Sequence, residues 1–190
     1  MNKPECKTYE DGSKEWYLNG ELHREDGPAV ENANGVKRWL LNGILHREDG
    51  PAVEYLDGKK YWFQEGELHR EDGPAVTGGS VAAKEWWIGG QLHREDGPAV
   101  ARANGGKEWW LNGRPHREDG PAIEYATGDK EWLISGKLHR EDGPAIEYAD
   151  GNNSWFLNNE PTDPETIVDL WLMRGKYCFY DEDNDCLSFG

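Results

Sequence analysis

A short apolar stretch that begins with tryptophan returns along the chain at a fixed interval. Its first copy is Trp16-Tyr17-Leu18, and polar residues and glycine separate it from the next copy. A fixed period in the twenties is typical of stacked repeat arrays, in which each unit packs only on its neighbours. The repeated tryptophans stand 23 residues apart, with one step of 24, at Trp16, Trp39, Trp62, Trp86, Trp109, Trp132 and Trp155.

One unit, residues 14–35, carries strand and turn signals and no helical period. The aromatic run 14–18 predicts a strand. Asn19-Gly20 predicts a type I′ hairpin turn, because both residues tolerate positive φ. Residues 21–31 predict a return strand, a turn and a further extended segment that starts at a proline, and residues 33–35 predict the next turn. The unit therefore predicts an antiparallel meander that each repeat extends.

The single long step between repeats falls within residues 77–83, Thr-Gly-Gly-Ser-Val-Ala-Ala. A slip of one residue within a strand would turn every following side chain to the other face of the sheet. We therefore expect the extra residue in the Gly78-Gly79 loop or in a bulge.

The repeat pattern starts near residue 7 and stops after Asn159. We therefore divide the chain into an array, residues 1–159, and a C-terminal segment, residues 160–190. In that segment Asp163 and Pro164 predict the start of a short apolar helix over residues 166–174, because Asp is a good N-cap and Pro a good first helical residue. Such a helix suits the cap that the end of a solenoid needs.

The last residues predict a terminal hairpin. Its strands are expected at residues 176–180 and 186–189, with Cys178 and Cys186 roughly opposite one another and an acidic tip between them. The complete fold prediction is an all-β repeat array, an antiparallel β-hairpin meander or solenoid, with a short C-terminal capping helix and this terminal hairpin.

The phrase His-Arg-Glu-Asp-Gly-Pro-Ala, which we call the motif loop, holds the residue types that metal sites and acid–base catalysis use. Catalysis needs one differentiated constellation, whereas this phrase recurs almost unchanged in six copies. We therefore predict a structural ladder, in which Arg pairs with Glu or Asp of adjacent units and Asp bonds turn amides. No catalytic residue, metal site or cofactor is predicted. The ladder residues are His23, Arg24, Asp26, His46, His69, His93, His116 and His139.

The residue after each repeated tryptophan is also large and apolar, so the strand is apolar on both faces. Because side chains alternate along a strand, these residues point away from the tryptophans. A sheet with one wet face should instead alternate apolar and polar residues. Either the sheet is covered on both sides, or one stripe is left for a partner. The partner-binding candidates on this stripe are Trp87, Trp110, Tyr17, Phe63 and Phe156.

The formal net charge of −16 narrows the class of partner. Binding to phosphate backbones or anionic lipids needs clustered Lys and Arg, so neither direct nucleic-acid binding nor a membrane is expected. Three cysteines without paired spacing fit a reducing compartment, and the start of the chain has no signal-peptide pattern. We expect a cytoplasmic protein, in the host cytoplasm if it is viral. The densest acidic candidate contact is Asp181, Glu182, Asp183 and Asp185.

Units of the form Trp-x-x-Asn-Gly-x-x-His-Arg-x-Asp-Gly-Pro-Ala resemble the divergent MORN-type repeats of bacterial, phage and large-virus proteins. The resemblance covers about residues 7–159, and Asn19-Gly20, His23, Gly27 and Gly35 keep their spacing in almost every copy. It implies antiparallel hairpin stacks without catalysis that serve as interaction scaffolds or oligomerisation modules, some of them labelled antitoxins. Residues 160–190 match no pattern of that family.

Two functions follow from the sequence as predictions. The first is a non-catalytic, acidic protein–protein interaction module that binds through the doubled apolar stripe. The alternative is an antitoxin-like or DNA-mimic-like inhibitor, of phage or viral type, that blocks a basic nucleic-acid-handling or defence protein. In both, the partner is a protein and no enzymatic activity is expected; a homodimer is a further option.

Overall fold

The protein is described here by a computed structural model. It describes residues 3–79, 84–173, 178–181 and 186–189. The chain divides into two compact units, Met1–Ala103 and Asn104–Gly190.

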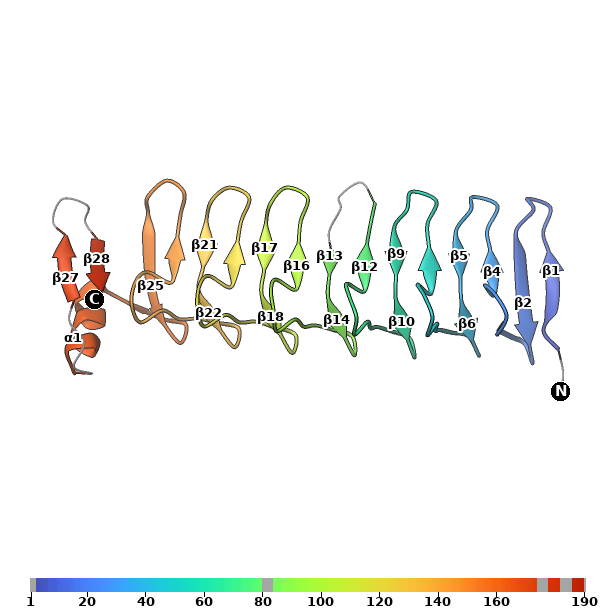
Figure 1. Cartoon of the computed structure of the whole chain (residues 1–190), viewed down its shortest axis with the longest axis horizontal. Helices are drawn as coiled ribbons and strands as arrows, with labels where there is room; N and C mark the ends of the chain where they lie inside the picture. Colours follow the sequence, from blue (N-terminus) through green and yellow to red (C-terminus); the bar gives the residue numbers. More distant parts are fainter. Residues whose placement is uncertain (1–2, 80–83, 174–177, 182–185, 190) are drawn as a thin grey trace. The chain divides into compact units, whose positions relative to one another are not determined.

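Unit 1 is an antiparallel ladder in which successive strands of the chain lie side by side (Figure 1). The predicted all-β meander is confirmed. The ladder strands are, in spatial order, β1 (Glu5–Thr8), β2 (Lys14–Leu18), β4 (Val30–Glu31), β5 (Lys37–Arg38), β8 (Val53–Glu54), β9 (Lys60–Tyr61), β12 (Val76–Thr77), β13 (Lys84–Glu85) and β16 (Val100–Ala101).

Short hairpins stand at the end of this ladder opposite to the longer hairpin tips (Figure 1). The predicted continuous strand 14–18 is found in the first repeat, but the later copies in unit 1 are interrupted at the tryptophan. There the Trp39 N–H donates to the Ala52 carbonyl at 2.8 Å. The short strands of unit 1 are β3 (Glu21–Leu22), which pairs with β2, then β6 (Leu40–Leu41) with β7 (Ile44–Leu45), β10 (Phe63–Gln64) with β11 (Glu67–Leu68), and β14 (Trp87–Ile88) with β15 (Gln91–Leu92).

Unit 2 repeats the same design and adds the C-terminal elements. Its ladder strands are β17 (Lys107–Glu108), β20 (Ile123–Glu124), β21 (Lys130–Glu131), β24 (Ile146–Glu147), β25 (Asn153–Leu157) and β26 (Glu160–Thr162). Its short hairpins are β18 (Trp110–Leu111) with β19 (Arg114–Pro115) and β22 (Leu133–Ile134) with β23 (Lys137–Leu138). The helix α1 (Pro164–Met173) and the hairpin β27 (Cys178–Asp181) with β28 (Cys186–Phe189) follow.

The predicted hairpin turns have the expected backbone. Asn19 and Gly20 have φ of 53° and 89°, and the equivalent pairs in the other repeats are also positive at both positions. Even Glu65, which is a poor residue for this region, takes φ of 50° before Gly66. Positive φ at both central residues is what a type I′ turn requires, and its twist matches that of the flanking strands.

The extra residue of the long repeat lies in the connection between β12 and β13. Val76 pairs with Glu85, just as Val53 of the preceding repeat pairs with Tyr61. In both repeats the partner is the residue before the tryptophan, so the register of the ladder is unchanged across the insertion. The register places the extra residue between Val76 and Glu85, within the connection where a loop or a bulge was expected. Residues 80–83 lie outside the described ones.

The C-terminal helix starts as predicted and the terminal hairpin corrects one expectation. Asp163 accepts the Thr166 backbone N–H at 2.8 Å, which is the N-cap hydrogen bond. In the hairpin, Cys178 pairs with Phe189 and Asp181 pairs with Cys186. The two cysteines are therefore not opposite one another, because the hairpin is centred later in the chain than the cysteine spacing suggested.

The core is thin and is built from small side chains. The alanine of each motif loop is 0% exposed, at Ala29, Ala52, Ala75, Ala99, Ala122 and Ala145. The valine after it is buried as well in unit 1, and Ala29 and Val30 pack with Leu40, Leu22 and Leu45. Among the described residues the only large side chain that is fully buried is Ile167 of α1. Stability therefore comes from many equivalent small contacts between neighbouring repeats.

Candidate binding surface

Each motif loop folds around its arginine. In the second repeat the Arg47 guanidinium lies over the Trp39 ring, 4.1 Å from its centroid. Its Nε donates to Asp49 at 2.9 Å and its Nη1 donates to the Pro51 carbonyl at 3.3 Å. The same stacking, at 4.0–4.3 Å, recurs in all six loops. The positive charge of each arginine is thus used inside its own loop.

The glycine of the motif loop makes room for this arginine. A Cβ added to Gly50 would stand 2.8 Å from Arg47 Cζ, closer than real side-chain contacts allow. The five equivalent glycines give 2.6–3.1 Å to their own arginines. A close approach of two groups, and not a turn with positive φ, therefore requires glycine here.

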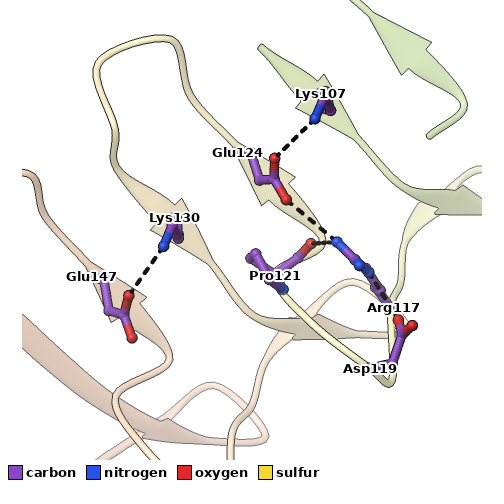
Figure 2. A network of polar contacts seen from close by, with 7 residues as sticks. All are labelled: Lys107, Arg117, Asp119, Pro121, Glu124, Lys130 and Glu147. Atoms are coloured by element: carbon purple, nitrogen blue, oxygen red, sulfur yellow. Dashed lines mark hydrogen bonds and ion pairs between the residues drawn. The ribbon is translucent and has the colours of Figure 1, made fainter. Parts of the chain in front are cut away.

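The arginine network extends to the ladder strands in both units. Figure 2 shows Arg117 between Asp119, the Pro121 carbonyl and Glu124, with Nη1 3.4 Å from the Glu124 carboxylate. Glu124 also lies 3.6 Å from Lys107 on the neighbouring strand. Figure 2 shows the similar ion pair between Lys130 and Glu147, at 3.8 Å.

These contacts correct one detail of the predicted ladder. Arg24 pairs with Asp26 and Glu31 of its own repeat, and no described motif arginine has an acidic partner from an adjacent unit among the contacts above. The reason is the stacking on the tryptophan, which fixes the guanidinium beneath its own loop. The histidine makes the connection between repeats instead.

The histidine Nδ1 accepts a backbone N–H from the turn of the next repeat. His46 accepts from Glu65 at 3.2 Å, and His23, His69, His116 and His139 accept from the equivalent residue at 3.0–3.3 Å. A neutral ring whose Nδ1 accepts carries its proton on Nε2. In the first motif loop the Nδ1 of His23 also lies 2.8 Å from Asn42 Oδ1. His93 also has a polar contact. The turn amide and the ring thus link one repeat to the next.

The aspartate of the motif loop is held ionised by its arginine. The hydrogen bond from Arg24 lowers the pKa of Asp26 below its usual range, and the charge of Arg24 adds to the effect. The same cause lowers the pKa of Asp49, Asp72, Asp96 and Asp119. The repetition of one environment gives no pair of groups with opposed pKa shifts, which is the arrangement that acid–base catalysis uses.

The glutamate of the motif loop is left facing solvent. Its side chain is 83–87% exposed in Glu25, Glu48, Glu71 and Glu95 of unit 1, and the histidine Nε2 lies 3.7–3.9 Å away. Two strands separate one loop from the next, so these carboxylates recur roughly every 10 Å at about 4.8 Å per strand. The aspartates of these loops are 82–86% exposed as well, but each is paired with its arginine. Unit 1 therefore presents a row of exposed carboxylates in which one glutamate per motif loop has no arginine partner among the ion pairs above.

The opposite side of the ladder in unit 1 is apolar, and we call it the aromatic face. Residues that pair directly across antiparallel strands share a face, so Tyr17 lies with Leu22 and Phe63 with Leu68. Trp16, by contrast, lines the same hollow as Leu18, His23 and Arg24 on the other side. The face in unit 1 consists of Tyr17, Leu22, Leu40, Leu45, Phe63, Leu68, Trp87 and Leu92.

Beside this row runs a second one in which buried valines alternate with longer side chains. Val30 pairs with Glu15 and Arg38, and Val53 pairs with Arg38 and Tyr61. The valines are 3–5% exposed in unit 1, and Val30 packs with Leu22, Leu40 and Leu45 of the aromatic face. Within the aromatic face Leu40 is buried, at 8% exposed, and the other members are half-buried. Over the residues that the structure describes, every strand of unit 1 belongs to the ladder or to a short hairpin, so no second layer lies across it.

The polar atoms of the aromatic rings are satisfied within their own strands. The Trp87 indole N–H donates to Glu85 at 2.9 Å, and the Tyr17 hydroxyl donates to Glu15 at 2.6 Å. That hydroxyl is the largest cause that lowers the pKa of Glu15 and keeps it ionised. The polar atoms of these two rings are thereby satisfied and acidic groups flank the rings. Over the Tyr17 ring lies Lys7, whose Nζ is 4.5 Å from the ring centroid.

In unit 2 the same positions are held by Trp110, Leu133 and Phe156, opposite Pro115, Leu138 and Pro161 respectively. The Trp110 indole N–H donates to Glu108 at 2.9 Å. The sequence pattern predicted the aromatic members but not the leucine before the histidine, a position that Pro115 takes in the fifth motif loop. The signal was present, because this leucine recurs with the motif loop, but its face depends on the hairpin register.

Only one of the four acidic C-terminal candidates lies within the described residues. Asp181 ends β27, while Glu182, Asp183 and Asp185 lie outside the described residues. Across the described residues there is no group of three or more His, Cys, Asp or Glu side chains that could hold a metal ion. No helix in the described part of the chain is long and apolar enough to cross a membrane.

No protein-family model matches the sequence, and a search of curated proteins finds no match either.

Proposed function

We propose that this chain is a non-catalytic interaction module that binds a protein partner through its aromatic face. The observation that carries the proposal is the half-buried apolar row of unit 1, which no described layer of that unit covers. Aromatic rings with satisfied polar atoms supply large apolar area at low entropic cost and are favoured in binding hot spots. The flanking glutamates suit a partner with a basic rim around an apolar centre.

The repeated hairpin also supports the proposal that the chain is a divergent MORN-type array. In each repeat the motif loop is occupied by contacts that hold the loop together and join it to the next repeat. This use of His, Arg and Asp supports a scaffold role in place of six separate reactive sites.

The test is capture of the partner by the tagged full-length chain, with matched substitutions on the two faces. Trp87→Ser combined with Trp110→Ser removes one ring from the aromatic face of each unit. Ile88→Ser is the control, because Ile88 is exposed and lines a hollow on the opposite side of the ladder. Loss of capture by the double variant, with capture kept by the control, is expected. If the double variant folds and captures the partner fully, the aromatic face is not the binding surface.

A second function is favoured by the row of exposed motif glutamates. We propose as the alternative that the chain inhibits a basic nucleic-acid-handling protein through this row. Because each arginine pairs with the aspartate of its own loop, the glutamate is the exposed carboxylate of each motif loop in unit 1 that remains without an arginine partner among the contacts above. At roughly 10 Å spacing, the row is sparser than duplex DNA, which carries one charge per about 1.7 Å. The alternative is therefore a charge-steered contact, not close mimicry of DNA.

A salt gradient separates the two functions after nuclease treatment. Contacts between exposed charges are screened at high ionic strength, whereas apolar contacts are not. A partner that is released at moderate salt, and is lost when Glu25, Glu48, Glu71 and Glu95 are changed to Gln, favours the inhibitor. A partner that stays bound at high salt and is lost with the tryptophans favours the aromatic face.

A further inference from the structure

The outer strand of unit 1, β1, has one side that no described strand of the unit occupies. β1 is the end of the ladder and pairs only with β2, with Cys6 opposite Trp16 and Lys7 opposite Glu15. All four of its residues are exposed. An unpaired edge of this kind is a template for another strand.

The hydrogen bonds of Trp16 show which backbone groups of β1 face outward. The Trp16 N–H donates to Ala29 and its carbonyl accepts from His23, both at 2.9 Å and both on the side away from β1. In an antiparallel pair, hydrogen-bonded and non-hydrogen-bonded positions alternate. Cys6, opposite Trp16, is therefore at a non-hydrogen-bonded position, and its N–H and carbonyl point outward. Thr8 is in the same phase, whereas Glu5 and Lys7 bond to β2.

We propose that a second copy of this chain pairs with β1, strand to strand and antiparallel, about a two-fold axis at Cys6. In this register the two Cys6 residues exchange their backbone hydrogen bonds, and each Thr8 N–H donates to the Pro4 carbonyl of the other copy. Glu5 of each copy then stands opposite Lys7 of the other. Opposite charges at directly opposed positions stabilise a strand pair.

The charges of β1 select this register against its neighbours. Moving the axis by one residue toward the start of the chain sets Glu5 against Glu5, and moving it one residue the other way sets Lys7 against Lys7. Like charges that are directly opposed destabilise a pair. Pro4 has no N–H, so it also limits how far the pairing extends. The charges of β1 thus disfavour the neighbouring registers and make this edge complementary to the same edge of a second copy.

The pairing joins the aromatic faces of the two copies. Residues opposed across antiparallel strands share a face, and Lys7 Nζ lies 4.5 Å from the centroid of the Tyr17 ring. The Glu5–Lys7 pairs therefore border the aromatic face, and both copies present that face to the same side. The dimer is inferred from the geometry of β1 alone, and this inference does not depend on the protein partner proposed above.

The test is a charge swap, read by sedimentation equilibrium on the full-length chain with its tag at the C-terminus. Lys7→Glu and Glu5→Lys should each weaken self-association at least about tenfold, because each replaces attraction by repulsion at both pairs. The double variant Glu5→Lys/Lys7→Glu should restore it. A mixture of the two single variants should form a mixed dimer, because it reunites opposite charges. Lys137→Glu in β23 is the matched control for net charge, and it should leave self-association unchanged.

Disulfide cross-linking through Cys6 tests the proposed register directly. Opposed residues at a hydrogen-bonded position have Cα atoms about 5.5 Å apart, within the range that a disulfide spans. In a Cys178→Ser/Cys186→Ser background, the oxidant diamide should link two copies through Cys6, and Lys7→Glu should reduce this linkage. Circular dichroism confirms that each variant is folded. A chain that stays monomeric at about 100 µM, or a dimer that is indifferent to Lys7→Glu, overturns the proposal.

Discussion

The motif loop and the tip of the ladder hairpin are both turns, yet only the motif loop keeps its sequence from copy to copy. In the motif loop the histidine, arginine, aspartate, glycine and alanine each meet a specific neighbour. The tip needs only a residue of positive φ and a closing hydrogen bond, such as Gly58 N–H to the Tyr55 carbonyl at 3.1 Å. Sequences as different as Ala33-Asn34-Gly35 and Leu56-Asp57-Gly58 satisfy it. Identity between internal copies therefore marks dense packing and is not by itself a sign of chemistry.

The largest expected effect breaks the motif loop at its glycine. Gly50→Ala forces the Arg47 guanidinium away from Trp39, Asp49 and the Pro51 carbonyl. Loss of a cation–π contact and of hydrogen bonds to a charged group should lower the free energy of unfolding by about 2–3 kcal/mol. Urea denaturation followed by tryptophan fluorescence measures this change.

The matched change in the hairpin tip is Gly58→Ala. There the added Cβ meets no atom within 4 Å, and only the φ of +84° is unfavourable. The expected loss is about 1 kcal/mol, the cost of a left-handed conformation for a residue with a side chain. Equal losses in the two variants would contradict the distinction between the motif loop and the tip.

A smaller effect should follow from removing the link between repeats. His46→Ala removes the acceptor of the Glu65 N–H, which is exposed and can bond to water instead, so the loss should be about 0.5–1 kcal/mol. His46→Asn should recover part of this loss, because an amide oxygen can occupy the place of Nδ1. Hydrogen exchange at Glu65 checks the cause. Faster exchange in the alanine variant but not in the asparagine variant is expected, and equal protection in both would show that the ring acts only by packing.

The smallest effect concerns acid pH. The folded pKa of Asp26, Asp49, Asp72, Asp96 and Asp119 is lowered by their arginines. The stability that these pairs add is present above the unfolded pKa of about 3.9 and is lost as the pH falls through the lower folded values. The melting temperature should therefore drop below about pH 4. Asp49→Asn should lower it at neutral pH and flatten this acid-induced drop, whereas the same change at Asp57 in a tip should have less effect, since no arginine contact of this kind holds it.

The features that could be predicted best from the sequence are those that local backbone chemistry determines. The paired positive φ of the Asn-Gly turns, the Asp163 N-cap and the position of the inserted residue all follow from one or two residues each. The acidic residues that pair with Arg24 could not be predicted, because the position of the guanidinium depends on its stacking with a tryptophan eight positions earlier. The separation of Cys178 and Cys186 depends on a hairpin register that spacing alone leaves open. The alternation of side chains along the strand was sufficient to predict the aromatic members of the aromatic face. The leucines of that face could be assigned only once the strand pairing was known.

Because the described repeats bury alanine and valine and no large side chain completely, unfolding of the array exposes little apolar surface per residue. The heat-capacity change of unfolding scales with that surface, and globular proteins average about 12–15 cal/mol/K per residue. A lower value is expected for this chain. Its stability curve would then be broad and flat, so the free energy of unfolding would vary little between cold and warm conditions and cold denaturation would be remote.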